Sequence, residues 1–171
     1  FYDVPNDAYY YEAVKWAVEN GITYGTSDTT FSPDASCTRA QMAAFLWRAA
    51  GCPEPKGTSS FTDVPSDAYY AKAVAWAVEN GITGGVGNDK FAPDDVCTRA
   101  QMAAFLCRLA GGKAEGIGTF TDVSADAYYA EAVQWAVENG ITDGVGDNRF
   151  APDVVCTRGQ MVTLLYRFFV K

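Results

Sequence analysis

The chain has 171 residues and a mass of 18.4 kDa, enough for one ordinary domain or a few small repeats. With 13 Lys and Arg against 21 Asp and Glu, its net charge is −8, which argues against a nucleic acid held through its phosphates. The absence of His removes the commonest general base and most zinc sites, and no apolar run is long enough to span a bilayer. Because the chain opens inside a motif at Phe1, we expect it to be a piece of a longer protein.

One unit recurs three times along the chain. The opening motif at residues 1–4 returns at residues 61–64 and 120–123. A tryptophan and an arginine of each copy keep the same spacing: Trp16, Trp76 and Trp135, and Arg39, Arg99 and Arg158. A fixed period of this length is typical of repeat architectures.

The copies are separated by two stretches, residues 51–60 and 111–119, that are rich in Gly, Pro, Ser and Lys and are typical of linkers. We therefore expect three repeats that together form one compact domain: residues 1–57, 58–115 and 116–171.

Each copy predicts a helix, a short hairpin-like loop and a second helix. In the first copy Asp7 is the expected N-cap of a helix of about a dozen residues. This helix is expected to end near Asn20, with Gly21 as the left-handed residue after it. Residues 22–33 are rich in Gly, Thr and Asp and are too irregular for a long element.

The second helix has a stronger start signal. Thr38 and Gln41 have the spacing of a capping box, and Cys37 and Met42 that of a hydrophobic staple. The box recurs as Thr98 with Gln101 and as Thr157 with Gln160. One two-helix unit buries little surface, so we expect the second helices to form a central three-helix bundle with approximate threefold symmetry. The fold class is mainly α.

An arginine follows each of these N-caps, namely Arg39, Arg99 and Arg158. The helix dipole is positive there, so a cation costs a few tenths of a kcal/mol. One interpretation is a solvated arginine or one paired with a carboxylate such as Asp3. The other is an anion site, in which free backbone N–H groups and the guanidinium converge on a carboxylate or phosphate.

Two further residue types repeat with the arginines. Each first helix is expected to begin with a tyrosine pair at residues 9–10, 69–70 and 128–129, one ring packing in the core and the other lining a surface suited to a sugar. The aspartates Asp3, Asp63 and Asp122 either form a turn or cap, accept hydrogen bonds from ligand hydroxyls, or orient the arginine. The mid-helix tryptophans are interpreted as packing residues.

We expect no metal site and no cofactor. The acidic loops lack the spacing of a calcium-binding EF-hand loop. Three of the five cysteines are staple residues and no CxxC pair exists, so mostly free thiols are expected.

The ordered set of motifs resembles the S-layer homology (SLH) domain of bacterial cell-surface proteins. The set comprises the opening F-x-D-V, a helix ending in N-G-I, a Gly loop leading to F-[SA]-P-D, and T-R-A-Q or T-R-G-Q at the second helix. The resemblance covers three full repeats. It implies a three-pronged spindle around a central three-helix bundle, located outside the cell at the bacterial cell wall.

The resemblance also implies a function and a site. The family anchors larger secreted surface proteins by binding a secondary cell-wall polysaccharide attached to peptidoglycan, often through an amino sugar that carries a ketal-linked pyruvate. The grooves lie between repeats. The matching positions are Arg39, Arg99 and Arg158; Asp3, Asp63 and Asp122; Tyr9, Tyr69 and Tyr128, where the family has tryptophan; and Gly25, Gly85 and Gly144.

The chain departs from the family pattern at several positions. Gln41 and its two equivalents replace the usual Glu, which keeps the cap and loses a charge. Gly159 replaces Ala and should weaken the start of the last helix by up to about 1 kcal/mol. The third site is therefore expected to be weaker or structural.

Three classes of function come into question for the chain. The leading hypothesis is non-covalent anchoring through polysaccharide, with no nucleic acid and no membrane insertion. The alternative is a protein–protein assembly module of a surface layer that binds no glycan. An enzyme is not expected, because the repeated aspartates are equivalent copies whereas acid–base catalysis normally needs two unlike carboxylates.

Overall fold

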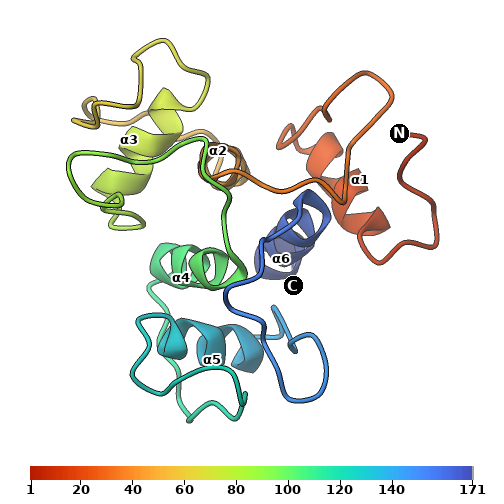
Figure 1. Ribbon diagram of the computed structural model, residues 1–171. Helices are drawn as coiled ribbons and strands as arrows, with labels where there is room; N and C mark the ends of the chain where they lie inside the picture. The colour runs from red at the N-terminus through yellow and green to blue at the C-terminus, as the bar shows by residue number, and fades with distance from the viewer. Residues whose placement is uncertain (171) are drawn as a thin grey trace.

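The computed structural model describes residues 1–170 and is mainly α-helical. It contains six helices and no extended strand within that range (Figure 1). The helices are α1 (Tyr11–Glu19), α2 (Arg39–Ala49), α3 (Ala71–Glu79), α4 (Arg99–Ala110), α5 (Ala130–Glu138) and α6 (Arg158–Val170). None of these helices combines the length and apolar character needed to cross a bilayer.

The second helix of each repeat lies at the centre of the molecule. Figure 1 shows α2, α4 and α6 grouped around the middle, while α1, α3 and α5 form three prongs at the outside. The predicted three-pronged arrangement around a central three-helix bundle is therefore confirmed.

Each outer helix packs against the inner helix of the preceding repeat. Helix α3 packs on α2, α5 packs on α4, and α1 closes the ring by packing on α6. A repeat in sequence is thus not a packing unit, since its two helices have their main contacts with different neighbours. This explains why a single copy would leave its apolar faces exposed to water.

Three cysteines close a ring of backbone hydrogen bonds at the start of the inner helices. The N–H of Cys37 donates to the carbonyl of Cys156 at 2.9 Å, that of Cys97 to Cys37 at 2.8 Å, and that of Cys156 to Cys97 at 2.8 Å. All three side chains are fully buried. The ring joins the three repeats directly and fixes the N-termini of the inner helices relative to one another.

The predicted capping boxes are confirmed. The Thr38 hydroxyl accepts from the Gln41 N–H at 3.1 Å, and the Gln41 side-chain oxygen accepts from the Thr38 N–H at 3.1 Å. The same pairs form at Thr98 with Gln101 and at Thr157 with Gln160. An amide oxygen therefore completes the capping box in all three repeats.

The predicted start of the first helix is wrong. Asp7 is exposed and lies outside the helix, which begins at Tyr11 and has only nine residues. Two successive turns come first, in which the Ala8 N–H donates to the carbonyl of Pro5 and the Tyr11 N–H to that of Ala8. The tyrosine pair therefore precedes the helix. The left-handed residue after the helix is confirmed, because Gly21 has a φ of +69°.

Candidate functional site

Each of the three repeated arginines is buried and reaches into the next repeat. Arg39, Arg99 and Arg158 are only 3%, 6% and 4% exposed to solvent. Arg39 Nε donates to the carbonyl of Phe91 at 2.8 Å. The equivalent bonds run from Arg99 to Phe150 at 2.8 Å and from Arg158 to Phe31 at 2.9 Å.

Aromatic rings hold the guanidinium of Arg39 on two sides. Its Cζ lies 4.8 Å from the centre of the Phe91 ring and 5.6 Å from that of Phe105. At Arg158 the corresponding rings are Phe31 and Phe45, at 4.7 and 5.4 Å. Burial lowers the pKa of Arg39, yet an arginine so placed remains a cation at neutral pH.

The expectation of free backbone N–H groups beside the arginine is wrong. The N–H of Arg39 donates to the carbonyl of Asp95 at 2.8 Å and that of Ala40 to Pro93 at 2.9 Å. In α6 the Gly159 N–H likewise donates to the carbonyl of Pro33 at 2.8 Å. The helix starts are therefore satisfied by loops of the neighbouring repeat, and any anion would have to be bound by side chains.

The first interpretation of the arginines, solvated or paired with a carboxylate, also fails. Within residues 1–170 no carboxylate lies in ion-pair distance of these guanidiniums, and all three are buried. Instead, the buried Nη2 of Arg39 has no hydrogen-bond partner among the described residues. A buried guanidinium nitrogen with an unused donor is destabilising, and a ligand would reach this nitrogen only after a movement of the side chain toward the surface.

The aspartates orient the arginines through a shared peptide segment. Asp63 accepts hydrogen bonds from the N–H groups of Phe91 and Ala92 at 2.9 and 2.8 Å, while Arg39 binds the carbonyl of Phe91. Asp122 holds Phe150 for Arg99, and Asp3 holds Phe31 for Arg158, in the same way. Of the three interpretations of the aspartates, these bonds support orientation of the arginine, through the peptide segment that both residues contact. Contact of the aspartates with ligand hydroxyls stays a prediction.

The pKa values of these aspartates reflect the same bonds. Partial burial acts to raise the pKa of Asp63, but the hydrogen bonds from the Phe91 and Ala92 amides outweigh it and lower the pKa below its ordinary value of 3.8. The pKa values of Asp3 and Asp122 are lowered for the same reason.

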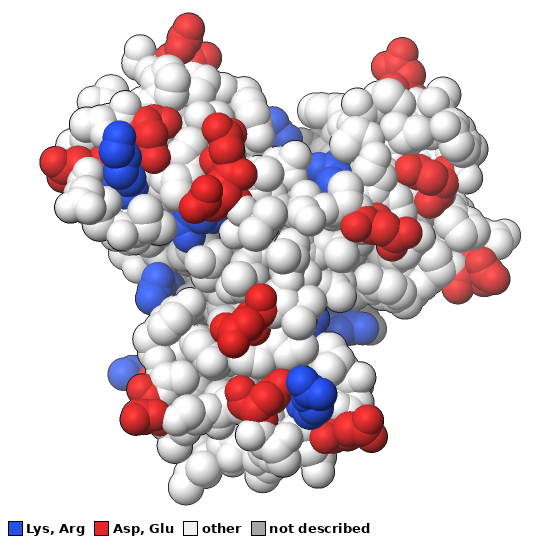
Figure 2. Space-filling model, viewed as in Figure 1, with Lys and Arg blue, Asp and Glu red and all other residues white. Residues whose placement is uncertain are grey.

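A groove of about 240 Å³ opens beside Arg39, and we call it the Arg39 groove. Its wall comes from three repeats: Arg39 of the first, the 83–86 loop and Arg108 of the second, and Tyr128 of the third. It also includes Gln101 and Phe105. Figure 2 shows Lys and Arg in the recesses between the prongs, and acidic residues together with some Lys or Arg on the prongs themselves.

A second groove, of about 250 Å³, has the same plan and is called the Arg99 groove. It is lined by Arg99 of the second repeat, the 142–145 loop and Arg167 of the third, and Tyr9 of the first. By the repeat spacing, the third set of residues equivalent to the lining of these two grooves is Arg158, Gly25, Arg48 and Tyr69. Burial raises the pKa of Tyr69, and the positive charges of Arg48 and Arg158 oppose that shift.

Each of the two grooves contains a second arginine that the sequence motifs did not indicate. Arg108 lies in the last turn of α4, and its Nη1 donates to the carbonyl of Ile82 at 2.9 Å. Arg167 and Arg48 make the equivalent bonds to Ile141 and Ile22. These arginines recur at the repeat spacing, which was the signal that could have found them.

Two of the three predicted tyrosines and two of the three predicted glycines line the two grooves: Tyr9, Tyr128, Gly85 and Gly144. Tyr9 and Tyr128 line them and are 63% and 65% exposed, whereas Tyr10 packs against the core. Gly85 has a φ of +88°, and a Cβ there would lie 2.5 Å from the Phe61 ring and 2.6 Å from the carbonyl oxygen of Lys90. Only glycine fits, and it brings the loop backbone to the groove wall.

The predicted aspartates lie outside the lining of the two grooves described above. Their contact with the site is the peptide that they share with the arginines. Within residues 1–170, no group of three or more Cys, Asp or Glu side chains is placed to hold a metal ion. The five cysteines are free thiols, with only Cys52 exposed.

Comparison with known proteins decides the family. The model of the S-layer homology domain matches three segments of the chain, at residues 1–43, 60–103 and 119–162. The chain belongs to the S-layer homology domain family. Each matched segment runs from the opening motif to the start of an inner SLH helix, so it contains the aspartate, tyrosine, loop glycine and arginine of one repeat.

Several relatives are long proteins with SLH-like segments. The chain is 32% identical over 157 residues to an amylopullulanase of Thermoanaerobacterium thermosulfurigenes, covering 88% of this chain and 8% of the relative. It is 34% identical over 136 residues to the surface-layer 125 kDa protein of Lysinibacillus sphaericus, covering 79% and 11%. It is 36% identical over 117 residues to a cell surface protein of Thermoanaerobacter kivui, covering 64% and 15%. The chain thus spans a small part of the relatives that it matches.

Proposed function

We propose that this SLH domain anchors a larger surface protein to the bacterial cell wall by binding an anionic secondary polysaccharide in the grooves between its repeats. The bound unit is an amino sugar that carries a carboxylate, such as a ketal-linked pyruvate. The domain itself binds and does not catalyse. The observation that carries the proposal is a groove between repeats whose wall combines Arg39 and Arg108 with the exposed ring of Tyr128.

The chemistry of the groove suits such a sugar. Arg39 and Arg108 offer positive charge and hydrogen-bond donors to a carboxylate, and the exposed ring of Tyr128 offers a flat surface for the sugar face. The loop at Gly85 adds backbone groups at close approach. The acidic prongs around the recesses disfavour long polyanions without blocking a single carboxylated sugar.

Several grooves on one domain act together on a repeating polymer. When one groove is occupied, the others see the next sugars at high effective concentration, which raises avidity by roughly 10²–10⁴ over a single site. Modest affinity in each groove is therefore enough to retain a surface protein on the wall.

Cosedimentation with purified cell walls tests the proposal. The domain should pellet with native walls and remain in solution after chemical removal of the pyruvate. Equal binding to both would contradict the carboxylate mechanism. Self-association without any response to glycan would favour the alternative, an assembly module of the surface layer.

Matched variants distinguish the effect of the groove arginines on wall binding from the effect of the net charge of the domain. The double variant Arg39→Ala with Arg99→Ala removes two buried groove cations, and Lys56→Ala with Lys113→Ala removes two exposed linker cations. Only the first pair should lose wall binding, with each groove weakened by at least about tenfold. If the buried arginines prove necessary for folding, Tyr9→Ala with Tyr128→Ala tests the same grooves through exposed side chains.

A further inference from the structure

A small apolar cavity adjoins the Arg99 groove. It measures about 10 Å³, and Arg99, Thr142 and Leu164 line both the cavity and the groove. The rest of its lining comes from buried apolar side chains, among them Leu106 of α4 and Ile141 of the loop after α5. We call it the Leu164 cavity.

The size and the lining of the Leu164 cavity suit a methyl group. A space of this size is about what one water molecule or one methyl group fills. A water molecule needs at least two polar partners, and the hydroxyl of Thr142 already accepts a hydrogen bond from the Gly144 N–H at 3.1 Å. An apolar group that enters the cavity instead leaves water and gains contacts with the lining.

The cavity lies where the other two repeats place an aromatic ring. The equivalents of Leu164 are Phe45 and Phe105. The centres of their rings lie 5.4 and 5.6 Å from the guanidinium Cζ of the repeated arginine beside each of them. Among the described residues Arg99 has one ring in such contact, that of Phe150 at 4.7 Å. The shorter leucine therefore leaves the second side of this guanidinium open.

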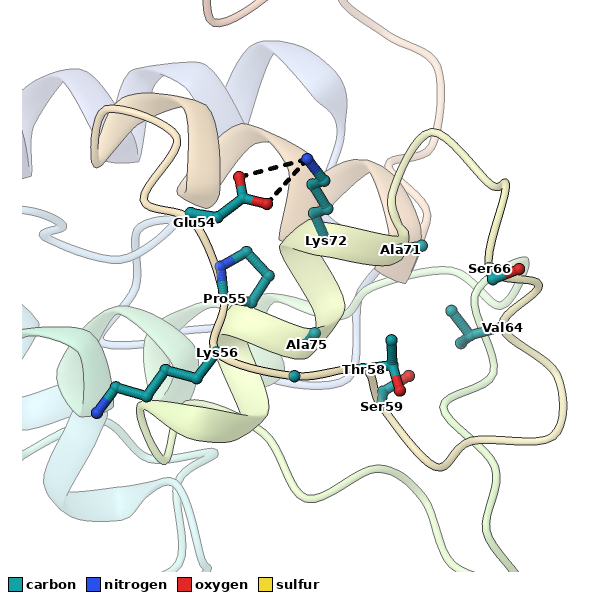
Figure 3. Close-up of a pocket in the computed structure, with 11 residues that line it drawn as sticks. Glu54, Pro55, Lys56, Thr58, Ser59, Val64, Ser66, Ala71, Lys72 and Ala75 are labelled. Carbon is teal, nitrogen blue, oxygen red and sulfur yellow. Dashed lines mark hydrogen bonds and ion pairs between the residues drawn. The ribbon is translucent and has the colours of Figure 1, made fainter.

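A larger groove on one of the prongs lacks this combination. It measures about 470 Å³ and lies between the first linker and α3 (Figure 3). We call it the linker groove. Its Lys72 forms an ion pair with Glu54 at 3.0 Å, and no arginine is among the described residues that line it. The linker groove therefore provides a control position and not a second site of this kind.

We propose that the Arg99 groove selects a sugar in which the carbon that bears the carboxylate also bears a methyl group, and that the Leu164 cavity receives this methyl group. The inference rests on the proposed function, because it requires Arg99 to bind the carboxylate. Arg99 lines both spaces, so a methyl group on the carbon next to the bound carboxylate is placed at the cavity. Leu164 is then a specificity-determining residue of this groove.

The other two sets of groove residues should lack this selectivity. A carboxylate bound at Arg39 or Arg158 has a phenylalanine ring in the place of the cavity. A ketal-linked pyruvate and an ether-linked lactate both carry a methyl group beside the carboxylate, whereas a uronic acid carries none. The domain would thus hold methyl-bearing anionic sugars at one groove and accept a wider range of carboxylated sugars at the others.

Calorimetry with matched pairs of ligands tests the inference. The first pair is an N-acetylhexosamine glycoside with a pyruvate ketal, and the same glycoside with a glyoxylate acetal of the same configuration. The second pair carries a lactate ether or a glycolate ether. Within each pair the members differ by one methyl group and have the same charge, so the nearby Asp143 affects both equally.

The expected result is a preference for the methyl-bearing ligand. Tyr69→Ala and Tyr128→Ala together leave the Arg99 groove as the intact one. In this domain the methyl-bearing member of at least one pair should bind at least about fourfold more tightly, which is the effect of burying one methyl group. The pair that shows the preference identifies the linkage, ketal or ether.

Variants of the cavity provide the second arm. Leu164→Phe should fill the cavity and abolish the preference. The reciprocal Phe105→Leu, in a domain with Tyr9→Ala and Tyr69→Ala, should create a preference in the Arg39 groove, and it decides the question if Leu164→Phe does not fold. Lys72→Ala in the linker groove is the control and should leave the preference unchanged.

The outcomes distinguish this inference from the proposed function. Equal binding of both members of each pair in the Arg99 groove would overturn the inference and leave the proposed function intact. A preference that persists in a folded Leu164→Phe variant would do the same. If none of the four ligands binds to the unmodified domain, the proposed function is wrong and the inference falls with it.

Discussion

The Arg39 groove and the Arg99 groove share a scaffold and differ in their lining. In both, an arginine Nε binds a phenylalanine carbonyl at 2.8 Å, and a glycine with positive φ shapes the loop. The guanidinium of Arg39 lies between two rings, whereas that of Arg99 has Phe150 alone, because Leu164 takes the place of Phe105. The Arg99 groove also carries an acidic residue, Asp143, where the other has Gly84.

The repeats therefore share the bonds that position the groove arginines and differ in the residues that a ligand would contact. The Asp–Phe–Arg connections, which join neighbouring repeats, recur in all three copies. So do the capping boxes, which stabilise the start of each inner helix. The residues that differ in the groove walls take no part in these shared bonds. We therefore expect the grooves to differ in affinity for one and the same anionic sugar.

The largest effect comes from breaking the shared scaffold at Gly85. A Gly85→Ala variant would clash with Phe61 and Lys90, and we expect it to lower the free energy of unfolding by about 3 kcal/mol. Gly87→Ala is the matched control: its φ is +103°, but a Cβ there meets nothing within 4 Å, so only about 1 kcal/mol should be lost. Chemical denaturation measures both, and equal losses would show that steric fit at Gly85 is unimportant.

Acid should weaken the same scaffold in all three repeats. The folded pKa values of Asp3, Asp63 and Asp122 lie below the ordinary 3.8, so the carboxylates stabilise the fold above about pH 4. This stabilisation is lost as the pH falls from there through the lowered folded pKa values. Denaturation curves at a series of pH values should show the decline, and Asp63→Asn should make it shallower. A stability that does not change between pH 5 and pH 2, on the order of two units below the ordinary value, would contradict the assignment.

Exchanging the lining residues should make the two grooves more alike. Asp143→Gly removes a negative charge from the Arg99 groove, and we expect a few-fold higher affinity of that groove for a carboxylated sugar, more so at low salt. Gly84→Asp should have the opposite effect on the Arg39 groove. Calorimetry on each variant, with the other groove disabled by Tyr9→Ala or Tyr128→Ala, measures the change. Affinities that do not respond to either substitution would place the ligand elsewhere.

The smallest structural effect is expected from modification of the thiols. Burial raises the pKa of Cys156 to about 12, and it raises the pKa values of Cys37 and Cys97 further above their ordinary range. Buried, protonated thiols are poor nucleophiles, so a thiol reagent at pH 8 should label Cys52 alone and leave the stability unchanged. Rapid labelling of three or more thiols in the native protein would contradict the buried cysteine ring.

Local signals in the sequence were enough for part of this architecture. The capping boxes could be predicted because Thr38 and Gln41 lie in one turn and need no other partner. The inner position of the second helices followed from their apolar faces. The prediction from Asp7 was wrong because a residue of N-cap type does not by itself start a helix. Asp7 lies in a turn closed by the hydrogen bond from the Ala8 N–H to the carbonyl of Pro5, and the helix begins only after it.

The rest depended on contacts between distant residues. Arg39 was identified from its unfavourable position, but its partner, the carbonyl of Phe91, is 52 residues away. The error about free N–H groups has the same origin, since Asp95 and Pro93 of the next repeat satisfy them. The cysteine ring joins all three repeats, and nothing in the residues near Cys37 indicates it.

The measurement that tests the central claim most directly is a crystal structure of this domain with a pyruvylated amino sugar. The account predicts the carboxylate of the sugar within hydrogen-bond distance of the guanidinium of Arg39 or Arg108, with the sugar ring against Tyr128. A sugar bound outside the grooves, or bound in them with its carboxylate turned away from the arginines, would contradict it.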